Sequence, residues 1–144
     1  MKPFGAMSPR LRWSAAGLSA VVALALASVA LWPIPAKPKE LLLLYVGAED
    51  CAPCRAWQKG EGAQFRATSE FARVPYREVK SATLRDLLKD ENWPEDLRIY
   101  RDQLGAGAGV PMWLVIADNR IIERSFGESQ WRTNTLPKVR ALLR

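Results

Sequence analysis

Residues 41–59 read LLLLYVGAEDCAPCRAWQK, and this stretch decides the fold. The apolar run 41–46 is typical of a strand that is buried on both faces of a sheet. The residues from position 51 to 59 predict a helix that begins directly after a short polar loop. Two cysteines, Cys51 and Cys54, therefore lie where a buried strand gives way to a helix.

The rest of the chain continues to alternate strands and helices. The expected elements are a strand at 74–79, helical segments at 83–88 and 97–104, strands at 112–116 and 121–124, and a last helix near Thr135. The apolar faces predicted for the three helical segments are Leu84, Leu87 and Leu88, then Leu97, Tyr100 and Leu104, then Leu136, Val139 and Leu143. Asp118-Asn119 is a hairpin signal between the last two strands, and the glycine-rich stretch 105–109 predicts a flexible loop. The order β-α-β-α(α)-β-β-α predicts an α/β domain, a mixed sheet covered by helices on both faces.

The first forty residues form a separate region. Residues 14–32 carry no charge and are about long enough to span a bilayer, and three basic residues precede them. The positive-inside rule then makes 1–13 a cytoplasmic N-terminus, 14–32 a transmembrane anchor, 33–39 a proline-rich linker and 40–144 the folded domain. A secretory signal cleaved after Ala30 is the alternative, which would release the domain. Both alternatives put the domain in an extracytoplasmic compartment, which in a bacterium is the periplasm.

Composition excludes several function classes. The net charge of +6 divides into +4 on residues 1–40 and +2 on the remainder, so the domain has a mixed surface and nucleic-acid binding is not expected. The chain has no histidine, which excludes Ser-His-Asp and Cys-His catalysis and imidazole metal sites. Two thiolates cannot complete a tetrahedral zinc site, so we expect no metal and no cofactor.

The spacing of the cysteines favours redox chemistry. Two cysteines three positions apart at a helix start lie on adjacent turns, so they can form a disulfide with little backbone movement. Cys51 is expected to be exposed at the N-terminal end of the helix, where free N–H groups and the helix dipole favour a thiolate. Cys54 is expected to be shielded one turn inside. We therefore expect Cys51 to attack and Cys54 to resolve the mixed disulfide. Pro53, in the first turn, stiffens the connection between them.

Three other interpretations of the pair remain open. A structural disulfide of this spacing would close too short a loop to stabilise the fold much. Two thiolates could hold Cu(I) in a membrane-tethered copper chaperone, although wider cysteine spacing and a distal histidine are usual there. In the third interpretation the chain is a scaffold and its cysteines are incidental.

Both halves of the domain resemble the thioredoxin family, and above all its periplasmic, membrane-tethered members. The run LLLLYVGAEDCAPCRAW at 41–57 is similar to the family's strand-loop-helix, and GVPMWLVIADNRIIERSFG at 109–127 is similar to its cis-proline loop, hairpin and following glycine. The resemblance covers about residues 40–144 and implies a thioredoxin-like fold. It also implies a nucleophilic Cys51, a resolving Cys54, and a cis bond at Val110-Pro111 that faces the disulfide. Without the resemblance, Pro111 is also compatible with an ordinary proline at the start of a strand.

Two positions depart from the family pattern. Many cytosolic thioredoxins have tryptophan before the first cysteine, where this chain has Asp50, and a buried acid six residues before that cysteine, where it has Tyr45. In the family, that acid helps to remove the proton of the second cysteine. Here no such acid is present at position 45, so water is the remaining acceptor for the proton of Cys54. Near Cys51, the negative charges of Glu49 and Asp50 would raise the pKa of the thiol, whereas the positive charge of Arg55 would lower it.

The expected function is that of a thiol–disulfide oxidoreductase. Its partners would be extracytoplasmic protein thiols and disulfides, together with a membrane redox partner if the domain acts as a reductant. The sequence does not fix the direction of electron transfer. Trp57 and Trp113 could line a substrate groove, but we expect them to be packing residues of the core.

Overall fold

The computed structural model describes residues 37–105 and 109–144. The expected membrane segment 14–32, most of the linker 33–39 and the middle of the glycine-rich loop lie outside these residues. Among the helices of the described residues, none has the length and apolar character needed to cross a membrane.

Within the described residues, four strands form one mixed sheet in the order β2-β1-β3-β4. The strands are β1 (Leu41–Ala48), β2 (Tyr76–Ser81), β3 (Met112–Ala117) and β4 (Arg120–Phe126). β1 runs parallel to β2 and antiparallel to β3, and β3 pairs antiparallel with β4. The parallel pair needs a crossover, which α2 (Ala52–Lys59) and α3 (Glu61–Arg66) supply. The mixed α/β architecture expected from the thioredoxin-like resemblance is therefore present.

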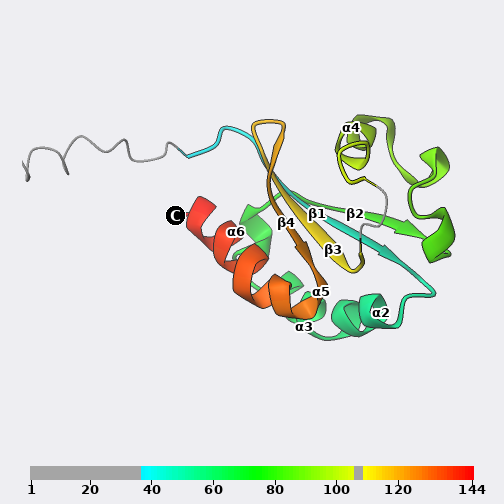
Figure 1. The fold of residues 1–144 in the computed structure, drawn as a ribbon. Coiled ribbons are helices and arrows are strands. Elements are labelled where there is room, and N and C mark those ends of the chain that lie inside the picture. Colours follow the sequence, from blue (N-terminus) through cyan, green and yellow to red (C-terminus); the bar gives the residue numbers. More distant parts are fainter. Residues whose placement is uncertain (1–36, 106–108) are drawn as a thin grey trace, which may run out of the picture. The chain divides into compact units, whose positions relative to one another are not determined.

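The sheet separates two hydrophobic clusters, because successive side chains of a strand point to opposite faces. Leu44 and Val46 of β1 face a cluster that includes Trp93, Leu97 and Tyr100. Leu43 and Tyr45 face the other cluster, which is rich in aromatic rings; its remaining fully buried members are Trp57, Phe65, Val74, Trp113, Val115, Trp131, Val139 and Leu143. In Figure 1, α2, α3 and α6 (Leu136–Leu142) lie on one side of the sheet and α4 (Arg98–Arg101) on the other. The continuous apolar run of β1 is thus buried on both faces, as predicted.

The helix predicted at 83–88 is wrong. The chain makes only a 3-10 turn at Leu84–Asp86, and two of the three leucines of the expected apolar face, Leu84 and Leu88, are 48% and 38% exposed. The carbonyls that would continue a helix are taken by other groups: the Asn92 amide donates to Asp86 O at 2.7 Å, and the Trp93 indole to Leu87 O at 2.7 Å. Further 3-10 turns at Asp90–Asn92 and Glu95–Leu97 lead into α4. Leu97, at the end of the second turn, and Tyr100, in α4, are buried as predicted.

The last helix, α6, begins at Leu136 with Thr135 as its N-cap, as predicted, but further helical backbone precedes it. Helical backbone starts at α5 (Gly127–Gln130), passes through a π-helical segment at Trp131–Thr135 and continues as α6. Pro137 has no N–H, and its ring clashes with the carbonyl four residues earlier in a regular α-helix. The wider π turn directly before it gives the chain room for the proline. The second strand also shifts: β2 begins at Tyr76, two residues after the predicted start.

Candidate functional site

The cysteine pair lies just beyond the C-terminal end of strand β1, at the start of α2. After Ala48 the chain makes a two-residue loop, and Cys51 is the N-cap of α2 with an extended backbone (φ −83°, ψ 108°). The backbone N–H of Cys54 donates to Cys51 Sγ at 3.1 Å, and the N–H of Arg55 donates to Cys51 O at 3.1 Å. Cys51 therefore takes the place of an ordinary capping side chain and satisfies donors of the first helical turn.

Cys51 and Cys54 form a disulfide, with their Cα atoms 5.2 Å apart. Neither cysteine is open to solvent, since Cys51 is 4% and Cys54 1% exposed. The expectation that Cys51 is exposed is thus wrong for this oxidised form. Ala48 packs against the disulfide from the end of β1, and Val110 packs on it from the loop before β3.

The Val110–Pro111 peptide bond is cis, the state that the resemblance implied. β3 follows directly, and its first residue Met112 pairs with Val46 of β1, which brings this loop level with the end of β1. Pro111 is buried, and its carbonyl accepts the N–H of Gly127 at 2.8 Å. The structure therefore brings Cys51, Cys54 and Val110 together, with Pro111 anchoring the facing loop to the chain after β4.

The acidic loop before the disulfide is attached to the end of β2. The N–H of Glu49 donates to Ser81 O at 2.9 Å, and Asp50 Oδ1 accepts the N–H of Leu84 at 2.9 Å. The guanidinium of Arg55 donates to the carbonyl of Glu49. The carboxylate of Asp50 thus holds the 3-10 turn of Leu84 beside the loop that precedes Cys51.

Tyr45 occupies the position where the resemblance expects a buried acid. Its side chain is 1% exposed and stacks on Trp57, with ring centroids 4.9 Å apart. Gly47, two residues on, makes room for it, because a Cβ at Gly47 would come within 2.4 Å of the Tyr45 hydroxyl oxygen. Burial raises the pKa of the Tyr45 phenol to about 12, so this group is a neutral hydrogen-bonding residue at physiological pH.

A carboxylate is nevertheless present on the neighbouring strand. Glu78 of β2 is the direct partner of Tyr45 in the parallel register, so both side chains lie on the same face of the sheet. Lys80 Nζ lies 2.7 Å from Glu78 Oε2, and Glu78 Oε1 accepts hydrogen bonds from the Tyr76 hydroxyl at 2.7 Å and the Gln58 amide at 3.2 Å. Burial alone would raise the pKa of Glu78, but the hydrogen bonds from Lys80, Tyr76 and Gln58 outweigh it and lower this pKa below its usual value.

A cavity of about 170 Å³ lies behind the disulfide. It reaches Cys54, and its other lining residues are Tyr45, Ala48, Glu49, Arg55, Gln58, Lys59 and Lys80. Our reading of the sequence missed Gln58, Glu78 and Lys80. The signal was available in part: Tyr76, Glu78 and Lys80 alternate along β2 and so share one face, but only the register with β1 brings that face to the cysteines.

The two tryptophans near the site belong to the core. Trp57 is 1% and Trp113 0% exposed, and their ring centroids lie 4.9 Å apart in an edge-on arrangement. This confirms the expectation that they are packing residues. They carry no solvent-facing surface for a substrate.

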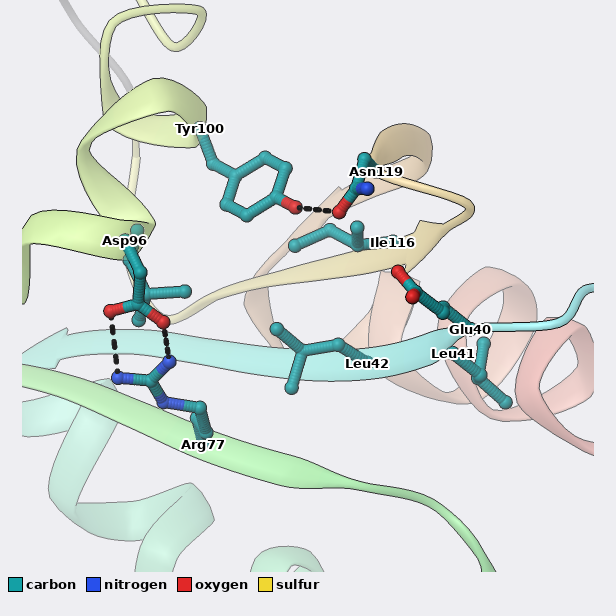
Figure 2. A pocket seen from close by; sticks show the side chains of 9 residues that line it. Glu40, Leu41, Leu42, Arg77, Asp96, Tyr100, Ile116 and Asn119 are labelled. Carbon is teal, nitrogen blue, oxygen red and sulfur yellow. Dashed lines mark hydrogen bonds and ion pairs between the residues drawn. The ribbon is translucent and has the colours of Figure 1, made fainter.

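A larger cavity of about 300 Å³ lies at the other end of β1, away from the cysteines (Figure 2). Leu42 and Ile116 contribute apolar surface, whereas the polar side chains largely bind one another. Arg77 pairs with Asp96, and the Tyr100 hydroxyl donates to Asn119 Oδ1 at 3.4 Å. Among the described residues, no group of three or more acidic, cysteine or histidine side chains is placed to hold a metal ion.

Comparisons with known proteins give a structural likeness but no match by sequence. No family model and no curated protein matches the sequence. Among solved structures, the chain is similar to the periplasmic thioredoxin SoxS from Paracoccus pantotrophus in its reduced form. The two chains are 19% identical over 72% of this chain and 96% of that chain, with a TM-score of 0.48.

Proposed function

We propose that the domain is a thiol–disulfide oxidoreductase that exchanges electrons with extracytoplasmic protein thiols through Cys51 and Cys54. The observation that carries the proposal is the disulfide itself, located at the N-cap of α2 directly behind a buried strand. A disulfide across three positions stabilises a fold little, so a structural role accounts poorly for it. The facing contact with Val110 gives the pair a side on which a polypeptide could lie.

The local geometry supports unequal roles for the two cysteines. In the reduced protein, the Cys54 N–H that points at Cys51 Sγ and the dipole of α2 would both favour a thiolate at Cys51. This thiolate attacks a substrate disulfide, forms a mixed disulfide and releases one substrate thiolate. Cys54 then attacks Cys51 Sγ, closes the intramolecular disulfide and releases the second substrate thiol, so two electrons pass to the substrate. The reverse sequence oxidises a substrate dithiol.

Cys51 is only 4% exposed in the oxidised form. A partner must therefore displace Val110, or the loop before β3 that carries it, to reach the sulfur of Cys51. This favours polypeptide partners that bind the surface around the site.

We further propose that residues 1–32 keep the domain outside the cytoplasm, either as an anchor or as a cleaved signal. A membrane redox partner would then return Cys51 and Cys54 to their starting redox state. An alkaline phosphatase fused after residue 40 should then be active; an inactive fusion protein would contradict this placement.

The decisive test is trapping with a defined substrate. The reduced Cys54→Ser variant, incubated with insulin, should accumulate a mixed disulfide through Cys51 that dithiothreitol releases. The matched Cys51→Ser variant should accumulate at least tenfold less, since Cys54 is the more enclosed thiol. Absence of any adduct on Cys54→Ser would exclude the proposed exchange. Tight stoichiometric binding of Cu(I) by a reduced protein without insulin reductase activity would instead support a copper carrier.

A further inference from the structure

The cavity behind the disulfide gives Cys54 surroundings different from those of Cys51. Cys54 is 1% exposed and lies inside the first turn of α2, yet its side chain forms part of the cavity wall. A thiol that must ionise before it attacks needs either a base or a route to water. Tyr45, the hydroxyl in this wall, stays protonated far above neutral pH because of its burial and cannot act as the base. The cavity's volume of about 170 Å³ is enough for several waters, and the side chains of Glu49, Arg55, Gln58, Lys59 and Lys80 provide polar groups among a lining that is otherwise mostly apolar.

The charges around the cavity are predominantly positive. Three cations line it, Arg55 and Lys59 from α2 and Lys80 from β2, against one anion, Glu49 from the loop before Cys51. Asp50 lies in the same loop, but its carboxylate binds the N–H of Leu84. The loop that covers the disulfide from the other side contributes Val110, which carries no charge.

Two of these cations are held in place, Arg55 by its hydrogen bond to the Glu49 carbonyl and Lys80 by an ion pair. The Lys80 ammonium lies 2.7 Å from Glu78 Oε2, and the same carboxylate is fixed by Tyr76 and Gln58. The negative charge of Glu78 is shared with Arg66, whose guanidinium lies 3.8 Å from Oε1, and Glu78 does not line the cavity. Lys80 therefore lines the cavity as the positive half of an ion pair, its side chain 52% exposed, whereas its partner Glu78 lies outside the lining.

We propose that Lys80, held by Glu78 in the wall of this cavity, favours the thiolate form of Cys54 and so speeds the resolution of mixed disulfides. The inference rests on the proposed function and names a positioning residue for its second step. In that step the Cys54 thiol gives its proton to water in the cavity, and the resulting thiolate attacks Cys51 Sγ. The Cys51–substrate bond breaks, and the substrate leaves as a thiolate that takes a proton from solvent.

The test separates the two steps with a small aromatic disulfide. The reduced protein is mixed with one equivalent of dithiobis(nitrobenzoate) in a stopped-flow instrument. Attack by Cys51 releases the first thionitrobenzoate, and resolution by Cys54 releases the second. We expect Lys80→Gln to slow the second phase by about three- to tenfold near pH 7 and to leave the first phase unchanged, as for loss of one charge across a partly solvated gap. Lys80→Arg keeps the charge and should restore the rate.

A pH series distinguishes a charge effect from a structural one. If Lys80 acts through the ionisation of Cys54, the second-phase rates of wild type and Lys80→Gln converge at high pH, and their difference shrinks in 1 M salt as screening increases. Lys138→Gln, an exposed lysine change on α6, serves as the matched control and should follow wild type. Equal slowing of Lys80→Gln at every pH, or a profile identical to wild type, would overturn the inference. A wild-type protein with no second phase would refute the proposed function itself.

Discussion

At the scale of single residues, Tyr45 and Glu78 show that the residue at one position is a poor guide to the chemical groups near the cysteines. Along the sequence, Tyr45 stands where the resemblance to thioredoxins leads one to expect a buried acid, so the site looks incomplete. In the structure, the carboxylate lies one strand away, at the residue paired with Tyr45. The sequence contains Glu78 in plain view, but its relation to Tyr45 depends on a parallel register that local patterning does not specify.

Gly62 provides a stability test at this scale. It lies in α3 against the indole of Trp57, where a Cβ would come within 2.7 Å of Cζ3 and 2.9 Å of the Trp57 carbonyl oxygen. Gly62→Ala would gain about 1 kcal/mol of helix propensity but would overpack rigid atoms by about 1–3 kcal/mol. We expect the clash to exceed the gain, with a net loss of up to about 2 kcal/mol in urea unfolding. Ala63→Ser, at an exposed neighbouring position, should change stability by less than about 0.5 kcal/mol.

At the scale of elements, the structure contains the strands, turns and helix starts that depend only on local sequence, where the sequence predicts them. The helix α2, the buried strand β1 and the β3–β4 hairpin were all expected from local patterns, because each depends on neighbours in the sequence. Asp118 and Asn119 adopt positive φ angles of 48° and 61°, the turn conformation that Asp and Asn tolerate and that two-residue hairpins prefer. The helix at 83–88 failed because groups from Asn92 and Trp93 compete for its carbonyls.

The hairpin turn also fixes the start of β1, which gives a second prediction. Asp118 Oδ1 accepts the N–H groups of Lys39 at 3.0 Å and Glu40 at 3.2 Å. Asp118→Ala loses this acceptor and places alanine at positive φ, so the free energy of unfolding should fall by about 1–2 kcal/mol. Asp118→Asn keeps both the amide acceptor and the tolerance of positive φ. Equal destabilisation by the two changes in urea unfolding would contradict this account.

At the scale of the whole molecule, the aromatic core links stability to alkaline pH. Burial raises the pKa of Tyr45 to about 12, and burial together with the hydrogen bond to Glu78 raises the pKa of Tyr76 as well. Both phenols remain protonated in the folded protein above pH 10, whereas those of the unfolded chain ionise there. The stability that their neutral forms contribute is complete below pH 10 and is lost as pH rises towards 12.

This predicts a steep alkaline loss of stability. Between pH 10 and 12 each raised phenol should lower the free energy of unfolding by up to about 1.4 kcal/mol per pH unit. Tyr45→Phe should make the fall shallower by about 1 kcal/mol per unit, measured by urea unfolding at several pH values. Below pH 9 the stabilities of the two proteins should run parallel. The same slope in both proteins above pH 10 would show that Tyr45 ionises normally in the folded state.

The sequence alone was enough to predict the local features: a buried strand, a cysteine at the start of the following helix, a partner cysteine one turn on, and a proline at the start of a later strand. These features depend on residues within a few positions of one another, so their patterns are readable in one dimension. Only the tertiary structure decided that Cys51 is covered by Val110, that Glu78 lies beside Tyr45, and that Lys80 reaches the cavity at Cys54. Those relations depend on the register between strands and on packing across the sheet, which bring together residues far apart in the chain.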